Sequence, residues 1–261
     1  MINIQKIIPL LKNIIIEANN EIMEIYGKDF KIFDKIDKSP LTEADIISND
    51  IIIKGLLNIN KKISKDILII SEENKKIDYD IRSSYDYLWI VDPIDGTKEF
   101  IKKNGEFTTN IGLVYKNKVI FGIVGIPTLN EIYLGGNNVQ SIKFNYIDNK
   151  IDTLIPREDF NPYIIAKSRS HMNIDTLKCI SDIKYTYNNV ITITSGSSIK
   201  MLLVANGQAN FYPRYTPTNE WDTCAAHGVL KGVGKNLLSN VDNKELLYNK
   251  ASLLNSFFYT N

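Results

Sequence analysis

The sequence has few of the residues that build disulfide frameworks and multi-histidine metal sites. Its 261 residues include two cysteines, Cys179 and Cys224, which form no CxxC pair. A disulfide framework and a structural zinc site are therefore not expected, and a reducing cytoplasm suits this composition best. The two histidines, His171 and His227, exclude an HExxH motif and every site that needs several histidines.

The chain also lacks an excess of charge of one sign. Its 31 Lys and Arg residues and 30 Asp and Glu residues leave a net charge of +1, which gives no electrostatic reason to expect a polymeric nucleic acid as partner. No apolar run reaches the roughly 20 residues that a membrane-spanning helix needs. Residues 1–26 have neither the basic start nor the cleavage site of a signal peptide, so none is expected.

What is present is a regular hydrophobic pattern. Apolar residues recur at helical spacing up to Tyr26, and Gly27 suits the end of that helix. Short apolar runs predict buried strands over residues 67–70 and 88–91, and alternation predicts an antiparallel meander over 107–146. Further helices are expected over residues 42–57, 173–180, 197–206 and 222–231, further strands over 163–166, 190–194 and 209–212, and meander turns at 116–118 and 135–138.

The order of these elements divides the chain into two parts. A polar stretch with two prolines, residues 148–162, separates them. Strands and helices alternate after this stretch, which favours an α/β layer. We therefore expect an N-terminal α+β domain over residues 1–155 and a C-terminal α/β domain over residues 156–261.

The sequence DPIDGT, residues 92–97, carries the strongest chemical signal. A buried strand is expected to end at Asp92, and Pro93 turns the chain because it has no N–H for a strand ladder. Gly96 allows a ligand to approach the backbone, and a helix that starts at Thr97 would offer free N–H groups to a phosphate. Two carboxylates beside an anion site suit Mg²⁺, although Asp92 and Asp95 could instead cap the helix.

Other acidic residues lie at similar positions. Glu72 follows the strand over residues 67–70, and Asp222 lies at the start of a later helix. A solvated loop acid and an N-cap are the alternative interpretations of these two residues. If the four carboxylates converge, each close pair repels by about 4 kcal/mol at an effective dielectric constant of 20, so they would need cations. Asp45 also completes a capping-box-like Thr42-x-x-Asp45 pattern.

Together these segments resemble the inositol monophosphatase superfamily of Mg²⁺-dependent, lithium-sensitive phosphatases. The resemblance rests on residues 39–45, 71–73, 92–97 and 221–222, in this order over nearly the whole chain. Within that superfamily the chain is similar to the CysQ-type 3′(2′),5′-bisphosphate nucleotidases. That similarity rests on residues 98–111, 168–171, 196–200, 206–214, 217–223 and 252–258, although Ser256 and Phe257 depart from the usual pattern.

The resemblance implies a layered αβαβα sandwich of the sugar-phosphatase type, α+β and α/β in its two parts. It implies that two Mg²⁺ ions, with a possible third, are held by Glu72, Asp92, the Ile94 carbonyl, Asp95 and Asp222. It further implies that Asp45 and Thr97 activate a water molecule while Glu72 helps to recruit metal. The backbone of Gly96 and Thr97 would hold the scissile phosphate, and Glu72, Ile94, Asp95 and Asp222 would line the substrate site.

The same resemblance implies that the rest of the nucleotide is bound by His171, Ser197, Lys200 and Arg214. The alternatives are an ordinary surface charge for Lys200 and Arg214 and a loop histidine for His171. His227 and Cys224 are expected to be packing residues.

The reaction implied by the resemblance is hydrolysis of the 3′-phosphate of adenosine 3′,5′-bisphosphate to AMP, with the sulfated analogue as a further substrate. An inositol-1-phosphate or fructose-1,6-bisphosphate phosphatase and an inactive nucleotide-binding module are the alternatives. The enzyme is expected in the cytoplasm, with contact to the inner face of the membrane left open, as monomer or homodimer.

Overall fold

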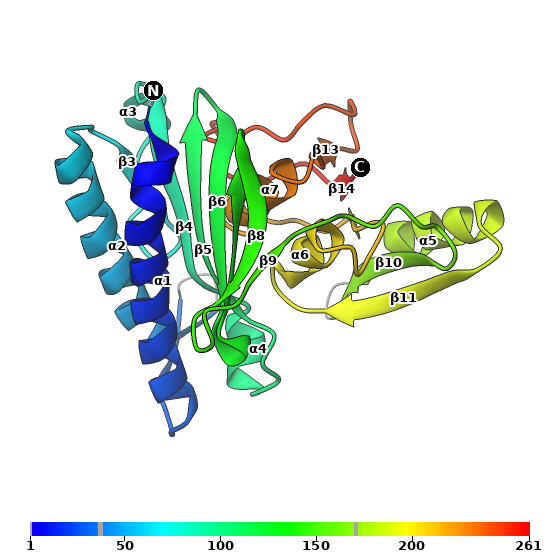
Figure 1. The fold of residues 1–261 in the computed structure, drawn as a ribbon, viewed down its shortest axis with the longest axis horizontal. Coiled ribbons are helices and arrows are strands. Elements are labelled where there is room, and N and C mark those ends of the chain that lie inside the picture. Colours follow the sequence, from blue (N-terminus) through cyan, green and yellow to red (C-terminus); the bar gives the residue numbers. More distant parts are fainter. Residues whose placement is uncertain (1, 36–38, 170–171) are drawn as a thin grey trace.

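The computed structural model describes residues 2–35, 39–169 and 172–261. Its elements form successive layers that run from left to right in Figure 1. Helices α1 (Ile4–Tyr26) and α2 (Glu43–Ile63) form the first layer and cover one face of a seven-stranded sheet. Both helices lie where the periodicity predicts them, and α2 continues six residues past its expected end. The predicted αβαβα sandwich is confirmed.

Most strands of the large sheet are neighbours in the sequence. The strand order is β3-β4-β5-β6-β7-β8-β9, with β3 and β4 parallel and every later pair antiparallel. The strands are β3 (Leu68–Ser71), β4 (Tyr87–Asp95), β5 (Thr108–Tyr115), β6 (Lys118–Ile126), β7 (Glu131–Gly136), β8 (Val139–Asn145) and β9 (Ile151–Thr153). The predicted meander is confirmed. However, Gly135 and Gly136 lie in β7 rather than in a turn, and η1 (Pro127–Leu129) forms a turn that was not predicted.

The third layer contains α6 (Ile199–Ala205) and α7 (Cys224–Lys231), and α7 packs on β5, β6 and β7. Glycine makes this contact possible on both sides. A Cβ atom on Gly122 of β6 would lie 1.8 Å from the Ala225 carbonyl oxygen, and one on Gly228 would lie 2.3 Å from the Gly122 nitrogen. The backbones of strand and helix therefore approach more closely than any side chain would allow.

The outer layers lie at the far side of α6. Strands β10 (Tyr163–Ser168) and β11 (Val190–Ser195) form a parallel pair, and α5 (Ile174–Thr186) lies above them on the right of Figure 1. A three-stranded sheet has the order β12 (Pro213–Arg214), β14 (Phe258–Thr260), β13 (Leu237–Ser239). The prediction of a strand over residues 209–212 is wrong. Within this range only Phe211 forms a β-bridge, to Ile165, because the Ile164 N–H donates to the Asn210 side chain and not to a backbone carbonyl.

The remaining elements are short. They are β1 (Ile32–Asp34), β2 (Pro40–Thr42), α3 (Tyr79–Arg82) and α4 (Thr97–Ile101). No helix in the described part of the chain is long and apolar enough to cross a membrane. The division into domains at residue 155 stays a prediction, and α7, from beyond that point, is part of the packing on the first sheet.

Candidate active site

Strand β4 brings Asp92 and Asp95 to the candidate site. The strand does not end at Asp92 as predicted but continues to Asp95 through a bulge, where Asp92 pairs with Asn110 and Asp95 pairs with Thr108. Pro93 lies within the bulge, because a residue without an N–H is tolerated there. The extra residue changes the register of the strand between the two acids.

The backbone turns sharply after Asp95. Gly96 adopts a φ of 96°, which favours glycine, and α4 begins at Thr97 as predicted. A Cβ atom on Gly96 would lie 3.0 Å from the Glu106 carbonyl oxygen and 3.3 Å from the Ser197 Cβ. Gly96 is the N-cap of α4, so Asp92 and Asp95 are not its capping residues.

Most of the predicted site residues line one cleft of about 310 Å³. They come from β4 and the start of α4, from the loop after β3, from α6 and the loop before it, from β12, and from the loop before α7. These lining residues are Glu72, Asp92, Ile94, Asp95, Gly96, Thr97, Ser197, Lys200, Arg214 and Asp222. Asp45 is fully buried, and His171 lies outside the described residues.

Three carboxylates converge at the base of this cleft. One oxygen each of Asp92, Asp95 and Asp222 lies within 4.8 Å of the others. Burial and then the charge of Glu72 raise the pKa of Asp92 well above its usual value. Burial likewise raises the pKa of Asp95 to about 6, although Lys200 opposes this shift. Burial and Asp95 raise the pKa of Asp222.

The donor set fits a divalent cation. The Asp92 Oδ1 atom is buried and has no hydrogen-bond partner among the described residues, which is costly unless another group occupies that position. The Ile94 carbonyl lines the same cleft. Carboxylate and carbonyl oxygens are the ligands that Mg²⁺ prefers, and a cation would offset both the burial and the repulsion that raise the pKa values of the acids.

Asp45 uses its two oxygens for different purposes. Its Oδ2 accepts hydrogen bonds from the Thr42 N–H over 2.7 Å and from the Thr42 hydroxyl over 2.5 Å. Its Oδ1 lies 3.2 Å from the Thr97 hydroxyl, which is also 3.3 Å from the Ile94 carbonyl oxygen. Burial raises the pKa of Asp45, and the hydrogen bonds from Thr42 offset part of that shift. Asp45 therefore forms both the capping hydrogen bonds with Thr42 and the contact with Thr97.

Lys35 is a residue that the sequence did not single out. Its Nζ atom lies 2.8 Å from a carboxylate oxygen of Glu72 and 2.6 Å from one of Glu73. Burial alone would lower the pKa of Lys35, but the two glutamates raise it overall. Burial raises the pKa of Glu73 to about 7. Glu72 is thus paired with a cation at the edge of the cleft and is not a solvated loop acid.

The second half of the chain supplies the opposite wall of the cleft. Lys200 is only 4% exposed, and its Nζ donates to the Ser195 carbonyl over 3.2 Å and to the Ser197 carbonyl over 2.5 Å. The surface-charge interpretation of Lys200 is therefore wrong. Burial lowers the pKa of Lys200 to about 8. Arg214 is partly exposed, and its guanidinium lies 3.3 Å from the Ser168 hydroxyl.

An ion pair at the cleft joins the two halves. Glu106 accepts two hydrogen bonds from the Arg169 guanidinium, over 3.1 and 2.6 Å, and a third from the Gly196 N–H over 2.7 Å. Both residues lie in segments that carry the family resemblance, but 63 positions separate them. The contact between Glu106 and Arg169 therefore could not be predicted from their spacing in the sequence.

Asp222 lies in a turn that precedes α7. The helix begins at Cys224 with Thr223 as its N-cap, so Asp222 is not the cap. Its Oδ2 instead accepts from the Asn219 N–H over 2.8 Å. His227 and Cys224 are fully buried, as expected for packing residues.

Comparison with known proteins finds relatives over most of the chain. The inositol monophosphatase family model matches residues 3–256. The curated 3′(2′),5′-bisphosphate nucleotidase CysQ of Shigella flexneri is 37% identical over 219 residues, which cover 83% of this chain and 84% of that protein. The protein of the same name from Buchnera aphidicola is 34% identical and covers 93% of this chain and 88% of its own length.

Solved structures show the same fold. The crystal structure of CysQ from Bacteroides thetaiotaomicron superimposes with a TM-score of 0.85 at 36% identity, and covers 95% of this chain and 94% of its own. The Thermotoga maritima IMPase TM1415 gives a TM-score of 0.73 at 20% identity, which supports the fold alone. Given the match over residues 3–256 and this shared fold, the chain belongs to the inositol monophosphatase family.

Proposed function

We propose that this protein is a Mg²⁺-dependent phosphatase that removes the 3′-phosphate of adenosine 3′,5′-bisphosphate to give AMP. The observation that carries the proposal is the convergence of Asp92, Asp95 and Asp222 in a cleft that also contains Thr97. The CysQ relatives, named as bisphosphate nucleotidases, support the choice of substrate. The sulfated analogue is a further proposed substrate, because it carries the same 3′-phosphate.

The carboxylates have the chemistry to hold two Mg²⁺ ions. In this proposal Glu72, Asp92 and the Ile94 carbonyl bind one ion, and Asp92, Asp95 and Asp222 bind the other. Glu72 would also help to recruit a third. When bound, Mg²⁺ lowers the pKa of a coordinated water and neutralises charge on the phosphate. Inhibition by lithium is part of the same proposal.

The protein's own groups supply orientation and proton transfer. The Thr97 hydroxyl can donate to Asp45 Oδ1 and accept a hydrogen bond from the attacking water. Asp45 is placed to take the proton that passes through Thr97. The N–H groups of Gly96 and Thr97, at the start of α4, are proposed to bind the scissile phosphate. No covalent enzyme intermediate is needed for this arrangement.

The wall across the cleft is proposed to bind the second phosphate and the adenosine. Arg214 presents a guanidinium to the cleft, and Lys200 contributes a buried positive charge close to Asp95. Ser197 lies beside Gly96 at the junction of the two walls. His171 is also proposed to contact the nucleotide.

The test is phosphate release from adenosine 3′,5′-bisphosphate with Mg²⁺, without Mg²⁺, and with Mg²⁺ and lithium together. We expect release that requires Mg²⁺, is suppressed by lithium and is at least tenfold faster than release from inositol 1-phosphate. Metal-dependent release from inositol 1-phosphate or fructose 1,6-bisphosphate alone would contradict the proposed substrate. No release from any of them would point to a nucleotide-binding module.

A further inference from the structure

Asp222 reaches the cluster of carboxylates on a loop, residues 217–223, rather than on a helix or strand. Within this loop the Asn219 N–H donates to Asp222 Oδ2 over 2.8 Å, and the Asp222 N–H donates to the Asn219 carbonyl over 3.2 Å. These hydrogen bonds orient the carboxylate relative to its own loop. They do not attach the loop to the rest of the protein.

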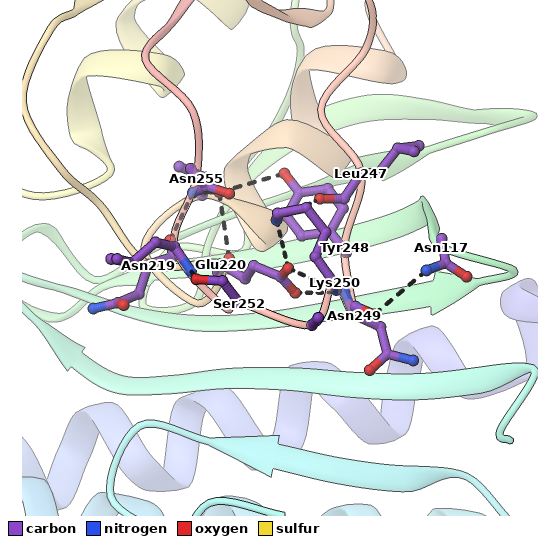
Figure 2. Close-up of polar contacts among 12 residues, drawn as sticks. Asn117, Asn219, Glu220, Leu247, Tyr248, Asn249, Lys250, Ser252 and Asn255 are labelled. Carbon is purple, nitrogen blue, oxygen red and sulfur yellow. Dashed lines mark hydrogen bonds and ion pairs between the residues drawn. The ribbon is translucent and has the colours of Figure 1, made fainter. Parts of the chain in front are cut away.

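Glu220 provides that attachment. It is fully buried, and its carboxylate accepts from the backbone N–H groups of Asn249 and Lys250 over 2.5 and 3.1 Å. The Lys250 ammonium lies 2.5 Å from the same carboxylate, and Figure 2 marks this ion pair with a dashed line. The Glu220 N–H also donates to the Leu253 carbonyl over 2.8 Å, and its own carbonyl accepts from the Cys224 N–H over 3.0 Å. Both the side chain and the backbone of Glu220 are thus hydrogen-bonded to other residues.

The partners of the Glu220 carboxylate and N–H all belong to one segment, residues 247–255, which we call the strap. The Asn255 side-chain amide holds the other side of the loop and donates to the Thr218 hydroxyl, the Asn219 carbonyl and the Thr223 hydroxyl (Figure 2). The strap is itself fixed to the first half of the chain. Arg82 forms hydrogen bonds with Asn249 and Ala251 of the strap, and Asn117 forms hydrogen bonds with Tyr248 and Asn249.

We propose that Glu220 is a positioning residue for Asp222, which it holds within reach of Asp92 and Asp95 by clamping the loop onto the strap. Like charges repel in a buried site, so an unattached loop would move Asp222 away from the other two acids. The clamp resists that movement before any cation arrives. A site already in its binding geometry binds metal more tightly, because less ordering accompanies binding. This inference rests on the metal site of the proposed function and not on its substrate.

The test is calorimetric titration of the full chain with MgCl₂ alone, without substrate. Glu220→Gln keeps the shape of the side chain but places an amide NH₂ against the N–H donors or the Lys250 ammonium. We expect Glu220→Gln to weaken Mg²⁺ binding by 10- to 100-fold, the effect typical of residues that orient ligands. The phosphatase rate of this variant should return toward that of the parent at high Mg²⁺.

The matched control is Glu131→Gln, which breaks an ion pair with Lys143 on β7 and β8. It should bind Mg²⁺ within twofold of the parent. Should Glu220→Gln fail to fold, Lys250→Met removes only the ammonium and should weaken binding at least threefold. A folded Glu220→Gln or Lys250→Met with the parent's affinity, or a Glu131→Gln equally weakened, would overturn the proposal. If the parent protein binds Mg²⁺ but hydrolyses no nucleotide, the proposed substrate is wrong, and the proposed role of Glu220 is unaffected.

Discussion

Asp45 illustrates how one side chain serves the fold and the proposed chemistry together. One oxygen closes the first turn of α2 through Thr42, and the other lies against the Thr97 hydroxyl. The two hydrogen bonds from Thr42 to Oδ2 fix the orientation of the carboxylate, and this orientation directs Oδ1 at the Thr97 hydroxyl. A capping interpretation from sequence alone would have assigned Asp45 to structure and missed its second partner.

The Asp45→Asn variant tests this second role. The amide keeps the size of the side chain but cannot accept a proton from Thr97, so phosphate release should fall by at least 100-fold. The Mg²⁺ affinity should change by less than threefold. Asp50→Asn, an exposed acid on the same helix, is the control and should leave the rate unchanged. A rate within tenfold of the parent would contradict the assignment of Asp45 as the proton acceptor.

The carboxylates at the base of the cleft lower the stability of the metal-free protein. Burial raises the pKa of Asp95 to about 6, above its value of 3.8 in an unfolded chain. Above pH 6 the folded protein therefore holds a charge that the fold disfavours, and the protein gains stability as pH falls from 6 toward 3.8. We expect Asp95→Asn to raise the free energy of unfolding by about 1–3 kcal/mol at pH 8 in EDTA.

Denaturant unfolding with EDTA and with Mg²⁺ measures this effect. Mg²⁺ should stabilise the parent protein, by the linkage between ligand binding and folding, and should stabilise Asp95→Asn much less. The same variant should lose nearly all phosphate release. A variant that is less stable than the parent in EDTA would show that the negative charge of Asp95 is favoured by its surroundings.

At the scale of elements, packing of α7 on the sheet depends on Gly122 and Gly228. The methyl group of Gly122→Ala would collide with the Ala225 backbone at 1.8 Å. We expect this variant to lose about 3 kcal/mol or more of unfolding free energy, or to fail to fold, because backbone cannot move aside as a side chain can. Thermal unfolding followed by circular dichroism measures the loss.

Gly27→Ala is the matched control for this prediction. Its Cβ atom would meet nothing closer than 3.6 Å, and its φ of −75° suits any residue. The change should be neutral or slightly stabilising, since alanine restricts the unfolded chain more than glycine does. Equal losses from both substitutions would show that close packing is not the reason for glycine at position 122.

Elements with a strong local pattern could be predicted from the sequence, and contacts between distant segments could not. The periodicity of α1 and the Asp92–Thr97 motif depend on neighbours along the chain, so both were found. The partners of Lys35 lie 37 and 38 residues away, and those of Glu106 lie 63 and 90 away. The surface-charge alternative for Lys200 could not be excluded from the sequence for the same reason, because only tertiary packing buries this lysine.

At the scale of the whole molecule, His227 links α7 to two segments that follow it in the sequence. Its ring lies 2.8 Å from the Tyr248 hydroxyl and 2.5 Å from the Asn236 side-chain oxygen. Burial lowers the pKa of His227 from 6.5 to about 4. The unfolded chain thus binds a proton at a higher pH than the folded protein does, and stability is lost as pH falls from 6.5 toward 4.

The His227→Gln variant measures this contribution. Between pH 7 and pH 4 the parent should lose about 3 kcal/mol of unfolding free energy through His227. The variant begins less stable but should lose correspondingly less over the same range. Urea unfolding at pH 7, 5.5 and 4 gives both curves, and parallel curves would show that His227 does not titrate in this window.

The order of strands in the large sheet bears on how the chain folds during synthesis. Strands β4 to β9 pair with their neighbours in sequence, so this sheet can form as soon as residue 153 has emerged from the ribosome. Asp222 and the strap that holds its loop are translated later. We therefore expect a nascent chain of this length to hold two of the three converging carboxylates without the third, so that the proposed metal site is completed only when the last quarter of the chain is added.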